Sequence, residues 1–354
     1  MEENSLFEEK EDLYEHFNFK VDKGTDLVRI DKYLLNLIPN TSRNKIQQAA
    51  KAECVIVNGK PVKQNYRVKP FDVISILMPY PPREIEIIPE NIPLDIVYED
   101  DDIIIINKNA GLVVHPGYGN YTGTLVNALT YYFLNKVDNQ GNPINPLLVH
   151  RIDKDTSGLL MIAKSEYAQI KLANDFYHHT IHRKYYALVW GDFKEDEGTV
   201  TAHIGRNPKD RLVMTVFPDG ESGKHAVTHY KVVERFGYVT LIECQLETGR
   251  THQIRVHLKS IRHPLFNDAT YGGDRILKGT TFSKYRQFIQ NCFKLLPRQA
   301  LHAKSLGFTH PITGKQLFFD SPLPEDMQAV IDKWRNYSQH KKYEEEDVID
   351  VDLK

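Results

Sequence analysis

Short apolar runs and helically spaced apolar residues alternate irregularly through the last two thirds of the chain. Short runs rich in strand-forming residues predict β-strands at 103–106, 159–163, 185–190, 228–234 and 239–246. Apolar residues at three- and four-residue spacing predict helices at 124–135, 166–178 and 250–262. This mixed order indicates an α+β domain, which we place at 94–335. Long polar loops at 138–146 and 207–224 are candidate binding segments.

The first 80 residues have a different pattern and predict a second, smaller α/β domain at 19–80. Helical spacing at 29–35 and 43–52 predicts two helices, with stop and cap residues at 39–42 between them. A hairpin is predicted at 55–62, because short apolar runs flank the turn Asn58-Gly59. Residues 79–93 contain five prolines, which cannot complete a strand ladder, so we expect a stiff linker at 81–93.

Charge is distributed unevenly along the chain. The formal net charge is −2, but residues 1–16 carry seven acids and one lysine, and residues 344–354 carry six acids and one lysine. Residues 17–343 therefore carry +9, enough to attract phosphate groups. We expect acidic, solvated and disordered tails at 1–18 and 336–354. The alternative role for these tails is competition with an anionic ligand for the basic surface.

Composition excludes several classes of protein. Apolar residues make up 41% and charged residues 26% of 354 positions, which is ordinary for a globular domain. The three cysteines stand far apart and support neither a disulfide framework nor a zinc ribbon, which fits a reducing cytoplasm. No apolar run approaches the roughly 20 residues of a membrane span, and the N-terminus lacks an apolar core. We therefore expect a cytoplasmic protein that is neither exported nor membrane-inserted.

The stretch VHRIDKDTSGLLMIAK, residues 149–164, places one acid between two basic residues ahead of a turn and a strand. Asp153 precedes the turn-forming residues 155–158, so we expect it on a loop that the strand anchors in the core. The positive charges of Arg151 and Lys154 favour an ionised carboxylate, suited to a nucleophilic or electrostatic role rather than to general acid catalysis. A surface acid in a charged turn is the alternative for this stretch taken alone.

This stretch closely resembles the signature of RluA/RluD-type pseudouridine synthases, in which His-Arg-Leu-Asp-x-x-Thr-Ser-Gly carries the catalytic aspartate. Ile152 replaces the usual leucine, a change between apolar residues of similar volume. Three further segments resemble the family in the same order: NKNAGLVVHPGYGNYTGTLVNAL (107–129), HRKYYALVWG (182–191) and LETGRTHQIRVHLKSIRHPLFND (246–268). With LHAKSLGFTHPITGK (301–315), the resemblance covers most of 90–325.

The resemblance implies a mixed-sheet pseudouridine-synthase fold with its active cleft across the middle. Pseudouridine formation detaches uracil from ribose, turns the base and joins its carbon 5 to ribose, so we expect no cofactor and no metal. The resemblance assigns the catalytic role to Asp153 and a base-stacking role to Tyr185, whose hydroxyl can also take part in proton transfer. Tyr186 must point to the opposite face of the strand. An ordinary core tyrosine is the alternative for Tyr185.

Basic residues of the same motifs complete the predicted site. The family places an arginine against the catalytic carboxylate; we prefer Arg255, which can pair with it in a bidentate manner, and Arg250 competes for this role. Arg151 is then free to enter the space that an extracted nucleotide leaves. The candidate substrate contacts are Arg151, His150, Arg250 and His252. Each arginine could instead contact an RNA phosphate.

The small domain resembles the S-four-type RNA-binding module in the segments SRNKIQQAAK, VIVNGKPV and KPFDVISI. Glu53-Cys54 and Phe71 stand where glycines are usual, so the turns there can differ. Residues 29–69 carry nine basic and two acidic residues, which suits contact with RNA phosphates, although a solvated charged surface is the alternative. The candidate RNA-binding residues are Arg29, Lys32, Arg43, Lys45, Lys51, Lys60 and Lys63.

The expected partner is RNA, bound by a monomer. Large-subunit ribosomal RNA is favoured because family members with this appended module mostly act there, and transfer RNA is second. If the protein were a non-catalytic RNA-binding or ribosome-assembly protein, we would expect Asp153 or Arg255 to be replaced, and both are present. A glycoside hydrolase would need a second positioned acid, whereas the neighbours of Asp153 are basic. His178 and His182 lie four apart, the spacing of a metal pair on a helical face, but no third ligand is evident nearby. We therefore interpret them as helix-end or RNA-facing residues.

Overall fold

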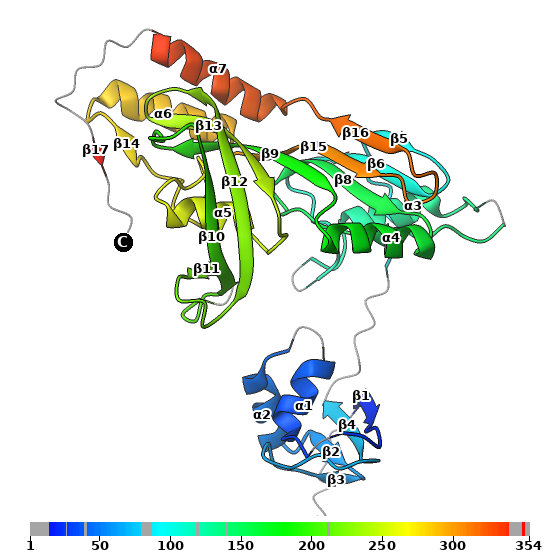
Figure 1. Ribbon diagram of the computed structural model, residues 1–354. Coiled ribbons are helices and arrows are strands. Elements are labelled where there is room, and N and C mark those ends of the chain that lie inside the picture. The colour runs from blue at the N-terminus through cyan, green and yellow to red at the C-terminus, as the bar shows by residue number, and fades with distance from the viewer. Residues whose placement is uncertain are drawn as a thin grey trace, which may run out of the picture. The chain divides into compact units, whose positions relative to one another are not determined.

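The computed structural model describes residues 14–25, 27–38, 41–78, 87–117, 120–138, 141–210, 213–339 and 349–350. The chain divides into two compact units, Met1–Glu86 and Ile87–Lys354 (Figure 1). Within the described ranges, no helix is long and apolar enough to cross a membrane.

The first unit packs two helices against a small antiparallel sheet. Helices α1 (Ile30–Leu37) and α2 (Arg43–Lys51) form where the apolar spacing predicts them, and the Ser42 side chain caps α2 by accepting from the Lys45 amide. The sheet has the strand order β1 (Tyr14–Lys20), β4 (Val73–Met78), β2 (Val55–Val57) and β3 (Lys60–Pro61). The predicted hairpin at 55–62 is the β2–β3 pair.

The ends of the predicted domains differ from the structure. β1 begins at Tyr14, inside the stretch expected as an acidic tail, because its backbone pairs with β4. At the other end, α7 (Glu325–Gln339) continues beyond 335, since its apolar face packs on α6 as far as Tyr337. Of the expected linker, 81–86 lies outside the described residues, while Ile88 accepts a hydrogen bond from Asn127 in the second unit. The remaining parts of both expected tails, 1–13, 340–348 and 351–354, also lie outside the described residues.

An eleven-stranded mixed sheet forms the frame of the described part of the second unit. Its main path has the order β11 (Met214–Phe217), β10 (Glu197–Arg206), β12 (Lys224–Arg235), β13 (Val239–Leu246), β9 (His182–Trp190), β15 (Leu301–Thr309), β8 (Ser157–Ala163), β6 (Ile103–Lys108) and β5 (Ile96–Glu99). β16 (Gln316–Asp320) pairs with β15, and β7 (Leu147–Leu148) pairs with β8. β15 and β8 are parallel, whereas the other pairs are antiparallel. A separate short pair joins β14 (Lys278–Gly279) to β17 (Ile349–Asp350).

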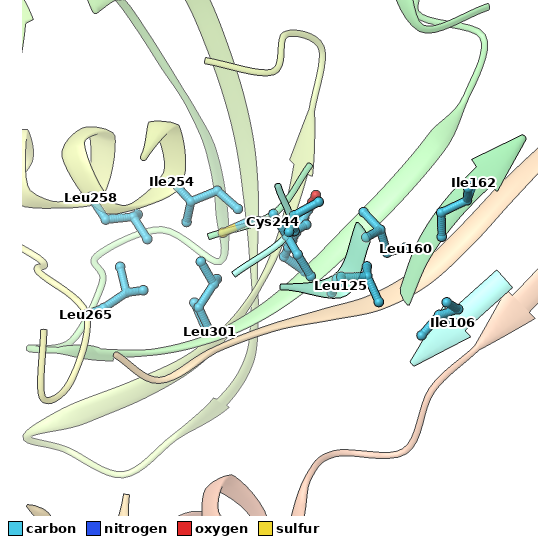
Figure 2. Close-up of a cluster of buried hydrophobic side chains, with 14 of the residues drawn as sticks. Ile106, Leu125, Leu160, Ile162, Cys244, Ile254, Leu258, Leu265 and Leu301 are labelled. Carbon is cyan, nitrogen blue, oxygen red and sulfur yellow. The ribbon is translucent and has the colours of Figure 1, made fainter. Parts of the chain in front are cut away.

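Two apolar clusters fix the helices on this sheet. Helices α3 (Leu125–Phe133) and α5 (Gln253–Ser260) pack with β6, β8, β9, β13 and β15 in one cluster (Figure 2). Helices α6 (Ser283–Leu295) and α7 pack together on the ends of β9 and β13, around the buried Trp190 and Trp334. Helix α4 (Glu166–Tyr177) packs on β8 through Ala168 and Leu172. The α+β class predicted from the sequence is confirmed.

The loop predicted at 207–224 is wrong in part, whereas the helix predicted at 166–178 is confirmed except for its last residue. The loop predicted at 207–224 contains the strand β11, which forms because it pairs with the distant β10. The helix predicted at 166–178 ends at Tyr177, so His178 caps it and His182 begins β9. These two histidines therefore do not share a helical face, and the spacing that resembled a metal pair has no such meaning here.

Candidate active site

A cleft of about 390 Å³ lies in the second unit beside β9, the middle strand of the sheet path. Its walls come from the 149–156 segment, the end of α4, β9 and the start of α5. It is lined by every residue predicted as catalytic or substrate-contacting: Asp153, Tyr185, Arg255, His150, Arg151, Arg250 and His252. Small-ligand pockets have volumes of about 300 to 1,000 Å³, so this cleft can take a single nucleotide.

Asp153 lies on a loop whose backbone is held by two buried cations. Lys108 Nζ donates to the Lys154 carbonyl at 2.9 Å and to two further carbonyls at 2.7 and 2.9 Å. Arg298 Nη1 donates to the Asp155 carbonyl at 3.0 Å. Burial lowers the pKa of Lys108 to about 7, yet three carbonyl acceptors match the three N–H groups of an ammonium. The loop is therefore fixed by side chains that lie outside it.

The residues on both sides of this loop are also fixed. Ile152, directly before Asp153, is buried in the apolar cluster of Figure 2. On the other side, Gly158 pairs with Ala303 across the parallel β8–β15 contact. Gly158 has a φ of +109°, and a Cβ atom there would lie 2.3 Å from the Ala303 carbonyl oxygen. Only glycine fits this approach, which explains the glycine of the signature.

Arg255, in the first turn of α5, lies between two carboxylates. Its Nη1 donates to Asp153 Oδ2 at 3.1 Å, while its Nε and Nη2 donate to the two oxygens of Asp268 at 2.7 and 2.8 Å. The Asp268 side chain is fully buried, whereas the Asp153 side chain is 21% exposed and lines the cleft. Burial opposes the charge on Arg255, but the two carboxylates outweigh this and raise its pKa. A permanently charged guanidinium therefore orients Asp153.

Arg250, the competing candidate for this contact, lies at the cleft with its side chain exposed. Its Nε donates to the carbonyl of His225 at 3.0 Å. Arg151 is exposed as well, in the segment that carries Asp153. The predicted helix at 250–262 begins later, at Gln253, because His252 has a left-handed φ of 56°. The Gln253 side chain stabilises this turn, since it accepts from the Arg250 amide at 3.0 Å and donates to the backbone of β12 at 2.9 Å.

His252 approaches Asp153 from the start of α5. Its Nε2 lies 3.9 Å from Asp153 Oδ1, and its Nδ1 lies 2.8 Å from the Tyr271 hydroxyl. Burial raises the pKa of Tyr271 to about 12, so this hydroxyl stays protonated. Because it already accepts from the Met214 amide at 3.1 Å, its own proton is directed to His252 Nδ1. Burial also lowers the pKa of His252, against the opposing charge of Asp153. A neutral His252 therefore carries its proton on Nε2, the nitrogen nearer to Asp153.

Tyr185 and Arg183 lie on one face of β9 and both line the cleft. Tyr185 is 6% exposed, and burial keeps its pKa above the ordinary value, against the opposing charge of Arg183 and with a smaller contribution from Asp153. Tyr186 lies on the opposite face and packs against the cluster of α6 and α7. The strand alternation that separated the two tyrosines in the sequence is thus present in the structure.

His150 lies half-buried beside β8 and lines the cleft, with its Nδ1 atom buried. Its Nε2 accepts from the Met161 amide at 3.0 Å, and its ring lies 4.7 Å from the ring of Phe176. Burial, aided by the nearby charge of Arg183, lowers the pKa of His150 to about 3. The ring is therefore neutral, and because Nε2 accepts, its proton is on Nδ1.

Three charged residues of the site were not predicted from the sequence: Lys108, Arg183 and Asp268. Each is buried, and charged residues are assigned to the surface by default. Strand alternation could have identified Arg183, because it stands two positions before Tyr185. Asp268 ends one of the family-like segments, but its pairing with Arg255 has no local signal.

The predicted RNA-binding residues lie in the first unit. Its basic side chains are exposed at Lys32, Arg43, Lys45, Lys51, Lys60 and Lys63, and half-buried at Arg29. Arg29 and Arg43 also donate to Asp31, which is fully buried and accepts from Gln47 at 2.7 Å. These two arginines therefore have a structural role that the sequence did not predict.

One group of side chains in the described ranges has the proximity of metal ligands: Asp100, Asp102 and His310. The Asp100 carboxylate accepts from Tyr98, from His310 and from two backbone amides, all within 2.9 Å. These hydrogen bonds brace the turn before β6, which is an ordinary structural task for such a cluster.

Comparison with known proteins identifies the family. A model of the RNA pseudouridylate synthase family matches residues 102–260, and a model of the S4 domain matches residues 28–74. An uncharacterized RNA pseudouridine synthase of Chlorobaculum parvum is 48% identical, over 89% of this chain and 96% of its own length. The ribosomal large subunit pseudouridine synthase D of Zymomonas mobilis is 42% identical, over 85% of this chain and 92% of its own length. The structure of human RNA pseudouridylate synthase domain containing 4 aligns with a TM-score of 0.53 at 24% identity, covering 68% of this chain and 93% of its own, and supports the fold.

The chain belongs to the RNA pseudouridine synthase family and is an enzyme of that class with an N-terminal S4 domain. Both resemblances predicted from the sequence motifs are confirmed.

Proposed function

We propose that this enzyme isomerises specific uridines of large-subunit ribosomal RNA and that Asp153 is its reacting carboxylate. The observation that carries the assignment is the 3.1 Å hydrogen bond from Arg255 to Asp153 inside a cleft of nucleotide size. A carboxylate fixed in this way can act on a uridine without first losing conformational freedom. This geometry is compatible with attack on the ribose and with attack on the ring.

The remaining cleft residues take roles that follow from their positions. The target nucleotide must leave its stack to reach the cleft, and we assign Arg151, which is exposed at the cleft, to the space that the nucleotide vacates. The buried ring of Tyr185 offers the base a stacking surface. His150, His252 and Arg250 line the same space and complete the substrate contacts.

The S4 domain and the relatives support ribosomal RNA as the substrate. Relatives named ribosomal large subunit pseudouridine synthase D are 42 to 44% identical over most of this chain. The basic first unit would bind folded RNA through phosphate contacts while the cleft acts on one nucleotide. Transfer RNA is the second candidate substrate. We further propose that the enzyme works in the cytoplasm as a monomer and needs no cofactor.

Mapping pseudouridines in cellular RNA with and without the gene tests this function. The proposal predicts that sites in large-subunit ribosomal RNA disappear on deletion and return when the gene is restored. The purified protein alone should form the same sites in a transcript of that RNA. Loss confined to transfer RNA would overturn the choice of substrate, and unchanged pseudouridine everywhere, with an inactive purified protein, would overturn the function.

A further inference from the structure

Arg183 has an environment that its own chain leaves incomplete. Arg183 is only 8% exposed, and it lines the cleft. Its guanidinium carbon lies 4.8 Å from the centre of the Phe176 ring. Its Nε has no hydrogen-bond partner in the described part of the chain, where no carboxylate pairs with it either. A buried guanidinium that pairs with no carboxylate is costly, so its open Nε is suited to bind an acceptor group of the substrate.

The surroundings of Arg183 define where that acceptor would be. The Arg183 side chain interacts with the Tyr185 hydroxyl through a hydrogen bond, so the open guanidinium lies next to the proposed stacking surface. Gly249 also borders the guanidinium, since a Cβ atom there would lie 3.5 Å from Arg183 Nη1, at ordinary van der Waals distance. His150 Nδ1, a second buried donor of the cleft lining, also lacks a partner among the described residues. Arg183 and His150 both lie against the Phe176 ring, and their two open donor atoms are suited to a flat ring with carbonyl oxygens.

We propose that Arg183 is a catalytic residue that binds a carbonyl oxygen of the target uracil and stabilises the negative charge on the base during the reaction. This inference rests on the proposed function and adds a residue to it. A pyrimidine base has carbonyl acceptors on its ring edge, and a guanidinium is a planar donor that remains charged. Donors held at the site of developing charge, away from water, are among the strongest catalytic devices.

The charge balance of the reaction places a negative charge on the base. If Asp153 attacks the ribose, a bond forms from its oxygen to C1′, the C1′–N1 bond breaks, and the electron pair stays on N1. The uracil is then an anion whose charge extends over its carbonyl oxygens. C5 of the turned base then forms a bond to C1′, and the bond from C1′ to the aspartate oxygen breaks. C5 loses its proton, and N1 gains one. Attack on the ring instead also moves an electron pair toward a ring carbonyl, so both routes use the same stabilising contact.

A phosphate of the target nucleotide is the competing ligand for Arg183, and it predicts a different measurement. A phosphate contact contributes to RNA affinity and leaves the rate at saturating RNA intact, whereas a contact with the developing anion acts on that rate. Substrate RNA with 5-fluorouridine at the target position distinguishes stabilisation of the developing base anion from a merely structural role of Arg183. Fluorine withdraws electrons and stabilises the base anion, so bond breaking should depend less on Arg183.

The experiment compares the full-length wild-type enzyme with Arg183→Met, Arg183→Lys and the control Lys184→Met. Lys184 stands on the same strand, half-buried and paired with Glu243 at 2.7 Å, away from the cleft lining. Single-turnover loss of intact uridine or 5-fluorouridine at saturating RNA gives the rate, and filter binding gives the RNA affinity. For Arg183→Met we expect unchanged affinity, a rate on uridine that falls by about 10²- to 10³-fold, and a clearly smaller fall on 5-fluorouridine. Arg183→Lys should lie between, and Lys184→Met should match the wild type.

Equal losses on both RNAs, or an intact rate with weakened binding, would overturn the proposal. Thermal unfolding checks that each variant is folded; if Arg183→Met is not, the same ratio measured on Arg183→Lys decides. Wild-type enzyme that converts neither RNA would instead refute the proposed function, so the two failures are distinguishable.

Discussion

Arg255 bridges two carboxylates, that of Asp268, which is fully buried, and that of Asp153, which is partly exposed in the cleft. The pair with Asp268 uses Nε and Nη2 and is fully buried, which leaves Nη1 directed at Asp153 at 3.1 Å. Because a guanidinium is a rigid fork, fixing two of its nitrogens fixes the third. Asp268 therefore sets the position of the proposed catalytic carboxylate without touching it.

Replacing Asp268 by Asn should lower the single-turnover rate by about 10- to 100-fold, the usual cost of removing a partner that orients a site residue. RNA affinity should stay close to wild type, because Asp268 is buried and far from solvent. Asp274→Asn, an exposed acid of the same connection, is the matched control and should retain full activity. An unimpaired Asp268→Asn enzyme would mean that Arg255 needs no second carboxylate.

Replacing Lys108 by Met should release the loop that carries Asp153. The methionine fills a similar volume but leaves three carbonyls without their donor, and each unpaired buried group costs about 1 to 3 kcal/mol. We expect a lower melting temperature together with a lower rate. Lys154→Met is the control, because it removes a neighbouring charge and keeps the carbonyl that Lys108 binds. Equal behaviour of the two variants would contradict the role given to Lys108.

The local pattern of the sequence was sufficient to predict those helices and strands that their own residues define. The helices of the first unit have apolar spacing, and α2 also has a serine cap. The predicted strands at 103–106 and 159–163 are short and uninterrupted. The ordered motifs also assign Asp153, Tyr185 and Arg255 to one predicted site. In the structure these residues line one cleft.

The parts that could not be predicted depend on distant partners. β10 alternates exposed and buried residues irregularly and is a strand because β12 and β11 pair with it. The contact of Arg255 with Asp153 spans 102 positions, and that of Lys108 with the Lys154 carbonyl spans 46. No local spacing encodes such contacts. The buried Arg183 was missed for the same reason, since composition alone places arginine at the surface.

Asp31 should make the stability of the first unit sensitive to acid. Burial raises the pKa of Asp31, but hydrogen bonds from Gln47, Arg29 and Arg43 outweigh this and lower it from 3.8 to about 2. A lowered pKa in the folded state gives stability that is complete above pH 3.8 and is lost as the pH falls through about 2. At neutral pH, Asp31→Asn should remove about 2 kcal/mol.

Hydrogen exchange of the full-length chain measures this effect locally. Amides of α1 and α2 should exchange faster in Asp31→Asn, while those of the second unit remain unchanged. The exposed Asp22, replaced by Asn, serves as the control in the same unit. Protection of α1 and α2 equal to wild type would refute the assignment.

The exposed lysines of the first unit should contribute to RNA affinity through counterion release. Replacing Lys45 and Lys51 by Gln removes two predicted phosphate contacts, so the slope of log affinity against log salt should fall by about 0.7 to 0.9 for each. The rate at saturating RNA should not change, because chemistry takes place in the other unit. Lys315→Gln, in the turn between β15 and β16, is the control. An unaltered salt slope would remove these lysines from the RNA-binding surface.

The most direct test of the account is Asp153→Asn, assayed on the target RNA in a single turnover. The substitution keeps the shape of the side chain and removes the charge that Arg255 orients, so we predict no detectable pseudouridine with RNA affinity near that of the wild type. Asp155→Asn, the same change two residues further on, should remain active. Wild-type conversion of uridine by Asp153→Asn would contradict the assignment of Asp153 as the reacting group.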